Sequence, residues 1–380
     1  MSKPKIRFKG YEEDWEQRKV KEFAIESEVK GHSGKDAKKL TVKLHNKGVY
    51  VADEKIQGSD NTQYYIRRAG QFIYGKQNFF NGAIGIVPKK LDKYESTKDV
   101  PAFDVSSDVN VDWLYYYIAR PEIYKPQEAL CTGTGSKRFH VNNFYNLSLA
   151  IPKMDEQIKI KEYFVHLDNL ITLHQRKCEE TKKLKKYMLQ KMFPQNGKRV
   201  PEIRFVGFTE DWEQRKLKET IEYIVDNRGK NPDYYCSEGI PVIDNFMIRN
   251  SLYPDLNTAT RFIDENLYQN FIRKYNEEDD ILLTLVGNGI GNITLFPKDK
   301  AVIIQNTLGF RAKEDKKFLF FLLMANNEAL VKLDRGMAQP SIRQDEILDL
   351  DIYVPSNSEQ IQIGEYFTYL DNLITLHQCK

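Results

Sequence analysis

Two long internal repeats constrain this chain more than any other feature of its sequence. Residues 4–22 (PKIRFKGYEEDWEQRKVKE) align without gaps with residues 201–219 (PEIRFVGFTEDWEQRKLKE), and 14 of 19 positions are identical. Residues 151–177 (IPKMDEQIKIKEYFVHLDNLITLHQRK) align with residues 354–380 (VPSNSEQIQIGEYFTYLDNLITLHQCK), and 18 of 27 positions are identical. We call these pairs the leading and trailing repeats. Their period is far longer than that of a solenoid, so they indicate a duplicated domain.

The segments between the repeats form two variable bodies. The leading repeats lie 197 positions apart and the trailing repeats 203, so the second body is six residues longer. Residues 69–88 and 278–297 share a pattern of strand, glycine-containing polar turn and strand, and residues 111–119 and 316–333 have helical composition. A hydrophobic content of 41% can fill more than one core, and 380 residues exceed what one core usually holds. The sequence therefore predicts two α+β bodies, each with its own core.

The trailing repeats predict two long helices with a heptad seam. Apolar residues and one histidine recur at alternating spacings of four and three. The seam residues are Ile160, Phe164, Leu167, Ile171 and His174 in the first helix, continued by Cys178, Thr181, Lys185, Met188 and Met192, and Ile363, Phe367, Leu370, Ile374 and His377 in the second. Residues 154–193 contain no proline or glycine, so the first helix should be roughly 55 Å long. Residues 178–193 (CEETKKLKKYMLQKMF) have no counterpart in the second trailing repeat, so we expect the second helix to be shorter.

We expect the two helices to pair with each other, because the first is longer than one small body can cover. The alternative is that each helix packs only on its own body. The predicted fold is two tandem α+β domains separated by long coiled-coil helices; the family resemblance given below implies that these are recognition domains related by a pseudo-twofold axis and that the helices are antiparallel. The predicted boundaries are 1–152 for the first domain, 153–198 for the first helix, 199–355 for the second domain and 356–380 for the second helix.

No catalytic or metal-binding motif is found. The chain has no GxxxxGK[ST] loop, and its four cysteines have no zinc spacing. The GNGIG run in residues 283–293 leads into strand-like residues, although a nucleotide-binding loop should open a helix. We therefore expect no catalysis, metal or cofactor in this chain. Two alternatives remain: a methyltransferase or nuclease with two recognition domains, or a protein-binding scaffold. No apolar segment is long enough for a signal or a membrane span, so a cytoplasmic location is expected.

The sequence resembles the specificity subunits of type I restriction-modification systems. The resemblance rests on both repeats, on RGKNP (228–232) followed by EGIPVI (238–243), and on the segments 133–152 and 336–355 that close the bodies. It implies that each body reads one half of a bipartite site in double-stranded DNA. It also implies that the helices set the spacing and dock two methyltransferase subunits, through which restriction subunits join. S-adenosylmethionine, ATP and magnesium would be bound by those partner subunits.

The resemblance also suggests which residues act. Trp15, Arg18, Trp212 and Arg215 of the leading repeats are expected to join the bodies to the scaffold or to dock partners. DNA phosphates attract Lys and Arg, and base edges pair with Arg, Asn and Gln. The DNA-binding candidates are Lys35, Lys38, Lys39, Arg67, Arg68, Lys76, Gln77, Asn78, Asn81, Lys137, Arg138 and His140 in the first body, and Arg228, Lys230, Asn288, Asn292, Gln305, Asn306, Arg311, Arg335, Gln339, Ser341 and Arg343 in the second.

Residues 76–81 and 288–292 are expected to be hairpin tips that enter a DNA groove, whereas the closing segments are expected to contact phosphates. The net charge is only +3, which is low for a chain that would hold DNA by itself. Partner subunits are therefore expected to share the binding. The isolated chain should bind DNA weakly and with a steep dependence on salt.

Overall fold

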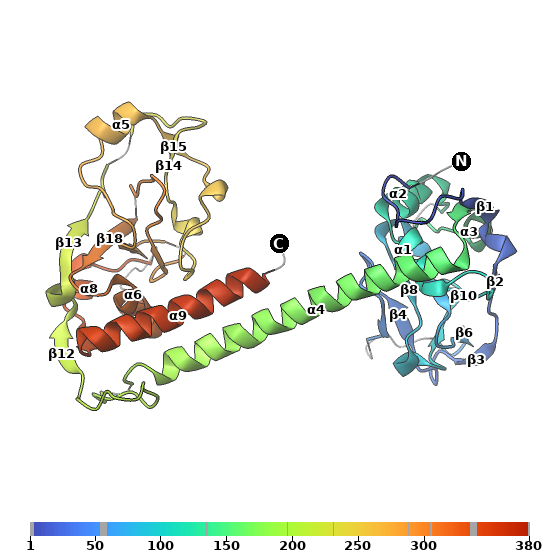
Figure 1. Cartoon of the computed structure of the whole chain (residues 1–380), viewed down its shortest axis with the longest axis horizontal. Helices are drawn as coiled ribbons and strands as arrows, with labels where there is room; N and C mark the ends of the chain where they lie inside the picture. The colour runs from blue at the N-terminus through green and yellow to red at the C-terminus, as the bar shows by residue number, and fades with distance from the viewer. Residues whose placement is uncertain are drawn as a thin grey trace. The chain divides into compact units, whose positions relative to one another are not determined.

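The computed structural model describes residues 4–53, 59–133, 136–195, 197–230, 232–287, 289–304, 306–334 and 340–378. The chain divides into two compact units, unit 1 (Met1–Leu170) and unit 2 (Ile171–Lys380). The boundary falls inside the long helix α4 (Met154–Lys191), which contributes its first part to unit 1 and its second part to unit 2 (Figure 1). Each unit contains one variable body.

Unit 1 is built on a four-stranded antiparallel sheet. Its strands, in spatial order, are β2 (Ala24–Glu26), β10 (Ala102–Val105), β7 (Phe72–Tyr74) and β8 (Ile84–Ile86). All three residues of β7 are buried, because both faces of the sheet are covered. Phe72 and Tyr74 pack in one core cluster with Trp113 of helix α1 (Val111–Ile118), and Ile73 packs in another with Val49 of strand β5 (Val49–Val51).

The remaining elements of unit 1 surround this sheet. Strands β3 (Lys30–Ser33), β6 (Gln63–Ile66) and β9 (Glu95–Ser96) form a second sheet, and β4 (Leu40–Val42) pairs with β5. The short helices are η1 (Val20–Glu22), η2 (Lys76–Asn81), η3 (Lys89–Leu91), α2 (Pro121–Tyr124), η4 (Lys125–Leu130) and α3 (Val141–Tyr145).

Unit 2 repeats the same sheet. The order is β13 (Ile221–Val225), β18 (Thr307–Ala312), β16 (Ile281–Thr284) and β17 (Ile293–Leu295), again antiparallel. Helix α6 (Lys316–Ala325) packs on one face, in the position that α1 has in unit 1. The predicted hairpins are thus confirmed as β7–β8 and β16–β17. The helix expected over residues 316–333 is interrupted at Asn326, after which α7 (Asn327–Val331) begins.

The other elements of unit 2 are short. They are η5 (Leu217–Thr220), β14 (Ile240–Pro241), η6 (Asn245–Met247), η7 (Leu256–Thr258), β15 (Phe262–Ile263), α5 (Glu265–Asn270) and α8 (Gln344–Leu348), and β14 pairs with β15. Among the described residues, no helix is long and apolar enough to cross a membrane.

The repeats close each body in the same way. Strand β1 (Glu16–Lys19) pairs antiparallel with β11 (Ser148–Ile151), and β12 (Glu213–Lys216) pairs in the identical register with β19 (Asp351–Val354). Each leading strand therefore lies beside the strand that runs into a trailing helix. Arg18 also reaches Asp108 at 2.6 Å, and Arg215 reaches Glu314 at 3.4 Å. Through these strand pairs and ion pairs, the repeated DWEQRK sequence joins the start of each body to its end.

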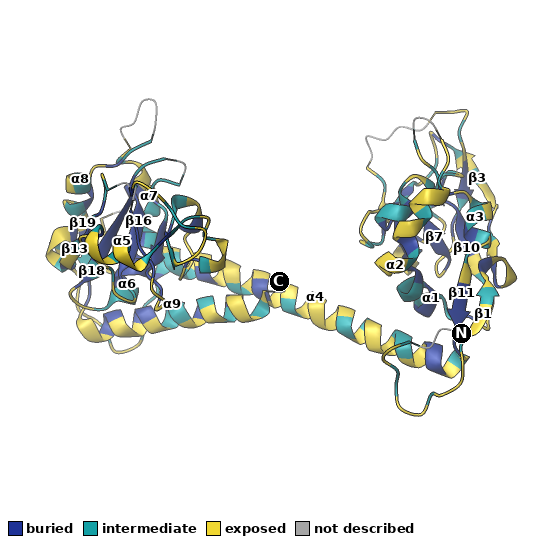
Figure 2. Ribbon diagram, turned by 90° about the horizontal axis from the view of Figure 1, so that it is seen from above, coloured by how far each residue is buried: buried dark blue, intermediate teal, exposed yellow. Residues whose placement is uncertain are grey.

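The two trailing helices meet within unit 2, where α9 (Asn357–His377) runs antiparallel to the second part of α4. His174 Nδ1 lies 2.8 Å from His377 Nδ1, and Lys185 Nζ donates to Asp371 Oδ1 at 2.7 Å. The sulfur of Cys178 lies 3.8 Å from the carbonyl oxygen of Ile374. Figure 2 shows one buried and one exposed side along α9, as expected for a helix in a seam. The predicted fold class, with its antiparallel coil, is confirmed.

Only the later part of the predicted α4 seam is formed. Ile363, Phe367, Leu370 and Ile374 of α9 are buried, as expected. On α4, however, Phe164 and Ile171 are 41% and 45% exposed, so the prediction that they fill the seam is wrong. The α4 residues that are buried against α9 lie later in the chain. These residues are Cys178 and Lys185 and, just beyond the helix, Met192 and Phe193.

Candidate nucleic-acid interface

In each unit a closing segment crosses the end of the central strand. In unit 1 the amide of Phe139 donates to the carbonyl oxygen of Lys76, two residues after β7, at 2.8 Å. In unit 2 the amide of Ile342 donates to the carbonyl oxygen of Leu285, directly after β16, at 2.9 Å, and Gly287 donates to Pro340 at 3.0 Å. This crossing brings together candidate residues that are about 60 positions apart in the sequence. We call the two places the closing edges of unit 1 and unit 2.

The closing edge of unit 1 carries Lys76, Lys137, Arg138 and His140. Arg138 Nε donates to Asp99 Oδ1 at 3.1 Å, and the Lys76 amide donates to the Asp99 carbonyl oxygen at 2.8 Å. Burial lowers the pKa of the half-buried Lys76. Lys137 is exposed and pairs with Glu128 at 2.8 Å, and His140 is exposed just before α3. These residues form one basic surface in which carboxylates hold the arginine and lysine side chains.

Residues 76–81 do not form a projecting hairpin tip. They form helix η2, whose Phe79 is fully buried and stacks on Phe139 with ring centroids 4.4 Å apart. Asn81 donates its side-chain amide to Asn78 at 3.1 Å, and Gln77 is exposed. The expectation of a tip that enters a groove is therefore wrong for this segment, because an aromatic contact with the closing segment folds it onto the body.

Arg67 belongs to the core of unit 1. It is 1% exposed, and its guanidinium donates to Ser96 Oγ and to the carbonyl oxygen of Ser27, both at 2.7 Å. Burial lowers its pKa to about 10. A guanidinium held in this way cannot reach DNA without unfolding of the surrounding strands. We therefore remove Arg67 from the proposed interface.

The remaining candidates of unit 1 lie away from the closing edge. Lys35 is exposed in the turn after β3, and Lys38 is exposed next to it. Lys39 is half-buried, with its ammonium 5.8 Å from the ring centre of Tyr64. Arg68 is exposed on the segment that leads to β7. Three of these four cations are therefore exposed at the surface of unit 1, and the fourth is half-buried.

In unit 2 the RGKNP segment meets the closing segment. Arg228 forms a bidentate pair with Asp226, with its shortest contact at 2.6 Å, and also donates to Gln344 Oε1 at 2.6 Å. This pairing lowers the pKa of Asp226. Arg343, which precedes Gln344, is 69% exposed and pairs with Asp345 at 2.8 Å. Lys230 is half-buried, with its ammonium 5.0 Å from the ring centre of Phe271. Arg228 and Arg343 thus lie at the same edge.

Three further candidates of unit 2 have structural contacts. Arg311 is bound to Asp280, which is fully buried, and to Glu277 at 2.9 Å, so we remove it from the proposed interface. The Asn292 side-chain amide donates to the Ile248 carbonyl oxygen at 3.1 Å. Asn306 is half-buried with a φ of +59°, and its carbonyl oxygen accepts from Leu285 at 2.7 Å. Asn292 and Asn306 therefore shape the closing edge.

Ser341 forms an isolated antiparallel β-bridge with Val286, and its backbone amide donates to Asp334 Oδ1 at 2.8 Å. Asn288, Gln305, Arg335 and Gln339 lie outside the residues that the structure describes.

Sequence analysis missed two exposed cations that the structure places beside aromatic rings. Lys43 lies 4.0 Å from the ring centre of Tyr50 across the β4–β5 hairpin, and Lys98 lies 5.6 Å from that of Tyr65. An alternating strand pattern around Lys43 could have identified the first. The second depends on a loop that only the fold brings near β6. Among the described residues, no group of three His, Cys, Asp or Glu side chains could hold a metal ion.

Comparisons with known proteins agree with this architecture. Residues 209–380 match the model of the family described as the type I restriction modification DNA specificity domain. Over 356 residues the chain is 27% identical to the type I restriction enzyme MjaVIII specificity subunit of Methanocaldococcus jannaschii, covering 88% of this chain and 76% of that protein.

Two solved structures share the fold. The S subunit of a type I restriction-modification system from M. genitalium superposes with a TM-score of 0.59 at 13% identity, covering 97% of this chain and 93% of that one. The HsdS subunit from Thermoanaerobacter tengcongensis has a TM-score of 0.50 at 16% identity, covering 96% of this chain and 90% of that one. The resemblance stated from the repeats is thereby confirmed.

Proposed function

We propose that this chain acts as a specificity subunit of a type I restriction-modification system and recognises a two-part target in double-stranded DNA, with one part read by each unit. The observation that carries the proposal is the repeated closing edge. Both units have the same sheet order and the same crossing of the central strand, but different side chains are displayed there. Two edges with the same backbone arrangement could dock on DNA in the same way. Their different polar side chains would then recognise two different half-sites.

The closing edges would act first on the phosphate backbone. Arg138 and Arg343 are each paired with one carboxylate, at 36% and 69% side-chain exposure. Such exposed pairs contribute little to stability, so a phosphate can replace the carboxylate at small cost. Arg228 donates from Nε and Nη2 to Asp226 and Gln344, so it would have to exchange these partners before its fork could pair with a guanine edge.

The chain would determine which DNA sequence is bound, and other subunits would catalyse the reactions. In this proposal two methyltransferase subunits dock on the trailing helices and leading repeats, bind S-adenosylmethionine and methylate adenine. Restriction subunits that use ATP and magnesium join through them. The basic run of residues 182–191 on α4 (KKLKKYMLQK) offers a charged surface for such docking.

Replacing Arg343 with alanine is expected to weaken binding of random-sequence duplex DNA by the complex with the methyltransferase subunit. If Arg343 contacts one phosphate, the slope of log K against log salt should become shallower by about 0.9. Arg138→Ala should do the same from unit 1. The slopes are measured by fluorescence anisotropy over a salt series.

Matched controls come from paired cations elsewhere on the same units. Lys300 pairs with Glu265 and Lys153 pairs with Glu13, both at the surface. Lys300→Ala and Lys153→Ala should leave the slope unchanged. If all four variants shift the slope equally, the closing edges are not the interface.

A further inference from the structure

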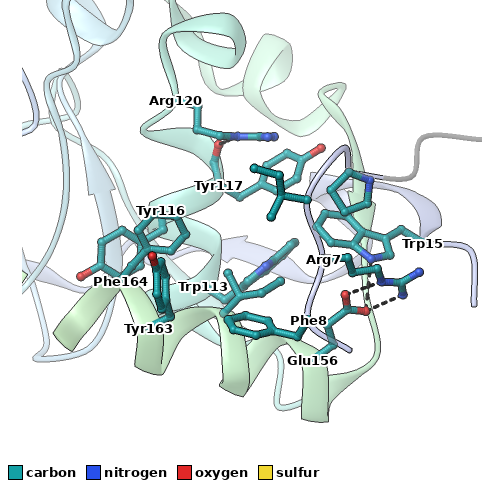
Figure 3. Close-up of a pocket in the computed structure, with 13 residues that line it drawn as sticks. Arg7, Phe8, Trp15, Trp113, Tyr116, Tyr117, Arg120, Glu156, Tyr163 and Phe164 are labelled. Atoms are coloured by element: carbon teal, nitrogen blue, oxygen red, sulfur yellow. Dashed lines mark hydrogen bonds and ion pairs between the residues drawn. The ribbon is translucent and has the colours of Figure 1, made fainter. Parts of the chain in front are cut away.

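The seam positions of α4 change in chemistry along the helix. In unit 1 they present Phe164, whose ring centroid lies 5.2 Å from that of Tyr116 in an aromatic pocket (Figure 3). In unit 2 they present His174, whose ring nitrogens can donate, accept or bind a metal ion. Helix α9 places His377 opposite His174, with the two Nδ1 atoms 2.8 Å apart and the ring centroids 5.0 Å apart. We call these two residues the histidine pair.

The histidine pair is a product of the duplication. His174 and His377 lie 203 positions apart and occupy the same position of the two trailing repeats. When two copies of one helix pair antiparallel, a residue close to the axis that relates them faces its own copy. One repeated histidine is therefore enough to bring two rings together. Sequence motifs for metal sites have ligands only a few residues apart, so spacing could not identify this pair.

The geometry of the histidine pair suits a metal ion. In the contact between the two Nδ1 atoms one nitrogen accepts, so at least one ring is in the neutral form that binds metals. Two imidazole nitrogens bound to a tetrahedral zinc ion, each at about 2.0–2.1 Å, lie about 3.3 Å from each other. The two nitrogens therefore need to separate by only about half an ångström to admit the ion.

The surroundings of the histidine pair are packed on one side and open on the other. Both rings are half-buried, and the residues that precede them, Leu173 and Leu376, are 46% and 73% exposed. One turn away, Ile374 is buried and its carbonyl oxygen lies 3.8 Å from the sulfur of Cys178. No third His, Cys, Asp or Glu joins the pair as a metal-binding group in the described part of the chain. Water must therefore complete the coordination from the open side.

We propose that the histidine pair binds a divalent transition-metal ion of the kind that imidazole nitrogen prefers, such as Zn²⁺, Ni²⁺ or Cu²⁺. His174 supplies one ligand from α4 and His377 supplies the other from α9. On binding, two metal–nitrogen bonds replace the hydrogen bond between the rings, and the donating ring moves its proton from Nδ1 to Nε2. The ion thereby holds the last turn of α9 on α4. The site lies outside the closing edges, so its failure would leave the proposed DNA recognition intact.

The first test is titration of Zn²⁺ into the full chain, followed by isothermal titration calorimetry. We expect one ion per chain. Residues that only orient a metal ligand already contribute about 10–100-fold to affinity, so His174→Gln and His377→Gln, which each remove a ligand, should weaken binding by at least about 10-fold. Glutamine is polar and of similar length, so the variants should keep the circular dichroism of the native protein.

Matched controls come from two histidines outside the pair. His166 is exposed on α4, and its counterpart in the second trailing repeat is Tyr369. His32 is exposed in unit 1 and pairs with Glu95 at 2.5 Å, which makes it the next candidate for zinc. His166→Gln and His32→Gln should both leave the affinity for Zn²⁺ unchanged.

The second test asks whether the ion joins the two helices. Hydrogen exchange of the amides in the last turn of α9 is measured with and without Zn²⁺. At a free zinc concentration 100 times Kd, linkage slows exchange through opening of this turn by up to about 100-fold. The same zinc concentration should not slow exchange in His174→Gln, whose substitution is on the other helix.

Three results would overturn the proposal. The first is the absence of saturable binding up to millimolar Zn²⁺. The second is binding that both glutamine variants retain, or that Cys178→Ser abolishes, because the ion would then be held by other side chains or by the thiol. The third is binding that requires the histidines but leaves exchange in α9 unchanged, because the ion would then not connect α9 to α4.

Discussion

Replacing Phe193 with alanine is expected to lower the free energy of unfolding of unit 2 by about 3–5 kcal/mol, the usual cost of removing a buried phenylalanine. The ring is 1% exposed and touches aromatic residues from the leading repeat, α6 and α9. Its removal leaves a cavity between three elements that have no other residue to fill it. Hydrogen exchange of the amides in β16 and β18 measures the loss specifically in unit 2.

The control for this variant is Leu184→Ala, at a 44% exposed position of α4. Leu184→Ala should lower the free energy of unfolding by well under 1 kcal/mol, because surface substitutions away from special features change stability little. Exchange rates in β7 and β10 of unit 1 should not change in either variant. A loss below about 1 kcal/mol for Phe193→Ala would show that Phe193 does not hold these three elements together.

Glu359→Ala is also expected to lower the free energy of unfolding of unit 2 by a large amount. Glu359 is 1% exposed and accepts both donors of Arg204, which is 12% exposed. Removal of one partner leaves a buried guanidinium without its counter-charge, which costs about 3–5 kcal/mol. The hydrogen bond to Glu359 is the largest cause of the raised pKa of Arg204, and this contribution is lost in the variant. Arg204 nevertheless stays charged, because a guanidinium is protonated throughout the neutral range.

Chemical denaturation followed by Trp212 fluorescence, in a background where Trp15 and Trp113 are phenylalanine, measures this effect. Glu359→Gln should recover part of the loss because one hydrogen bond can re-form. The control is Glu213→Ala, which removes the 64% exposed partner of Arg215 and should have little effect. Equal losses in Glu359→Ala and Glu213→Ala would contradict a structural role of the buried pair.

The repeats and their periodicity predicted most of the architecture. Two bodies with the same sheet, their hairpins and the two long heptad helices follow from patterns that lie within short segments, whereas the antiparallel pairing of the helices was implied by the family resemblance. The partner of each seam residue could not be predicted in the same way. Phe164 and Phe367 occupy the same position of nearly identical repeats, yet one is exposed and the other buried. In unit 2 the end of α4 and the residues just after it, Met192 and Phe193, pack in one cluster with Phe367, and this segment lies outside the aligned repeat.

The candidate DNA residues were predicted less well, for a related reason. Composition identifies a lysine or arginine but not its surroundings. Arg67 and Arg311 look like their neighbours in sequence, but one is enclosed by backbone carbonyl oxygens and the other by Asp280 and Glu277. The segment 76–81 had the composition of a turn, but the long-range contact between Phe79 and Phe139 made it a helix. Contacts between distant residues decide all three cases.

The central claim is that each unit reads its own half of one DNA target. Its most direct test is methylome sequencing of DNA from a host that lacks other methylases and expresses this chain with its methyltransferase subunit. We expect methyl-adenine at a two-part motif whose halves are separated by a gap of fixed length. Methylation at a single uninterrupted motif, or none from a complex shown to be assembled, would contradict it.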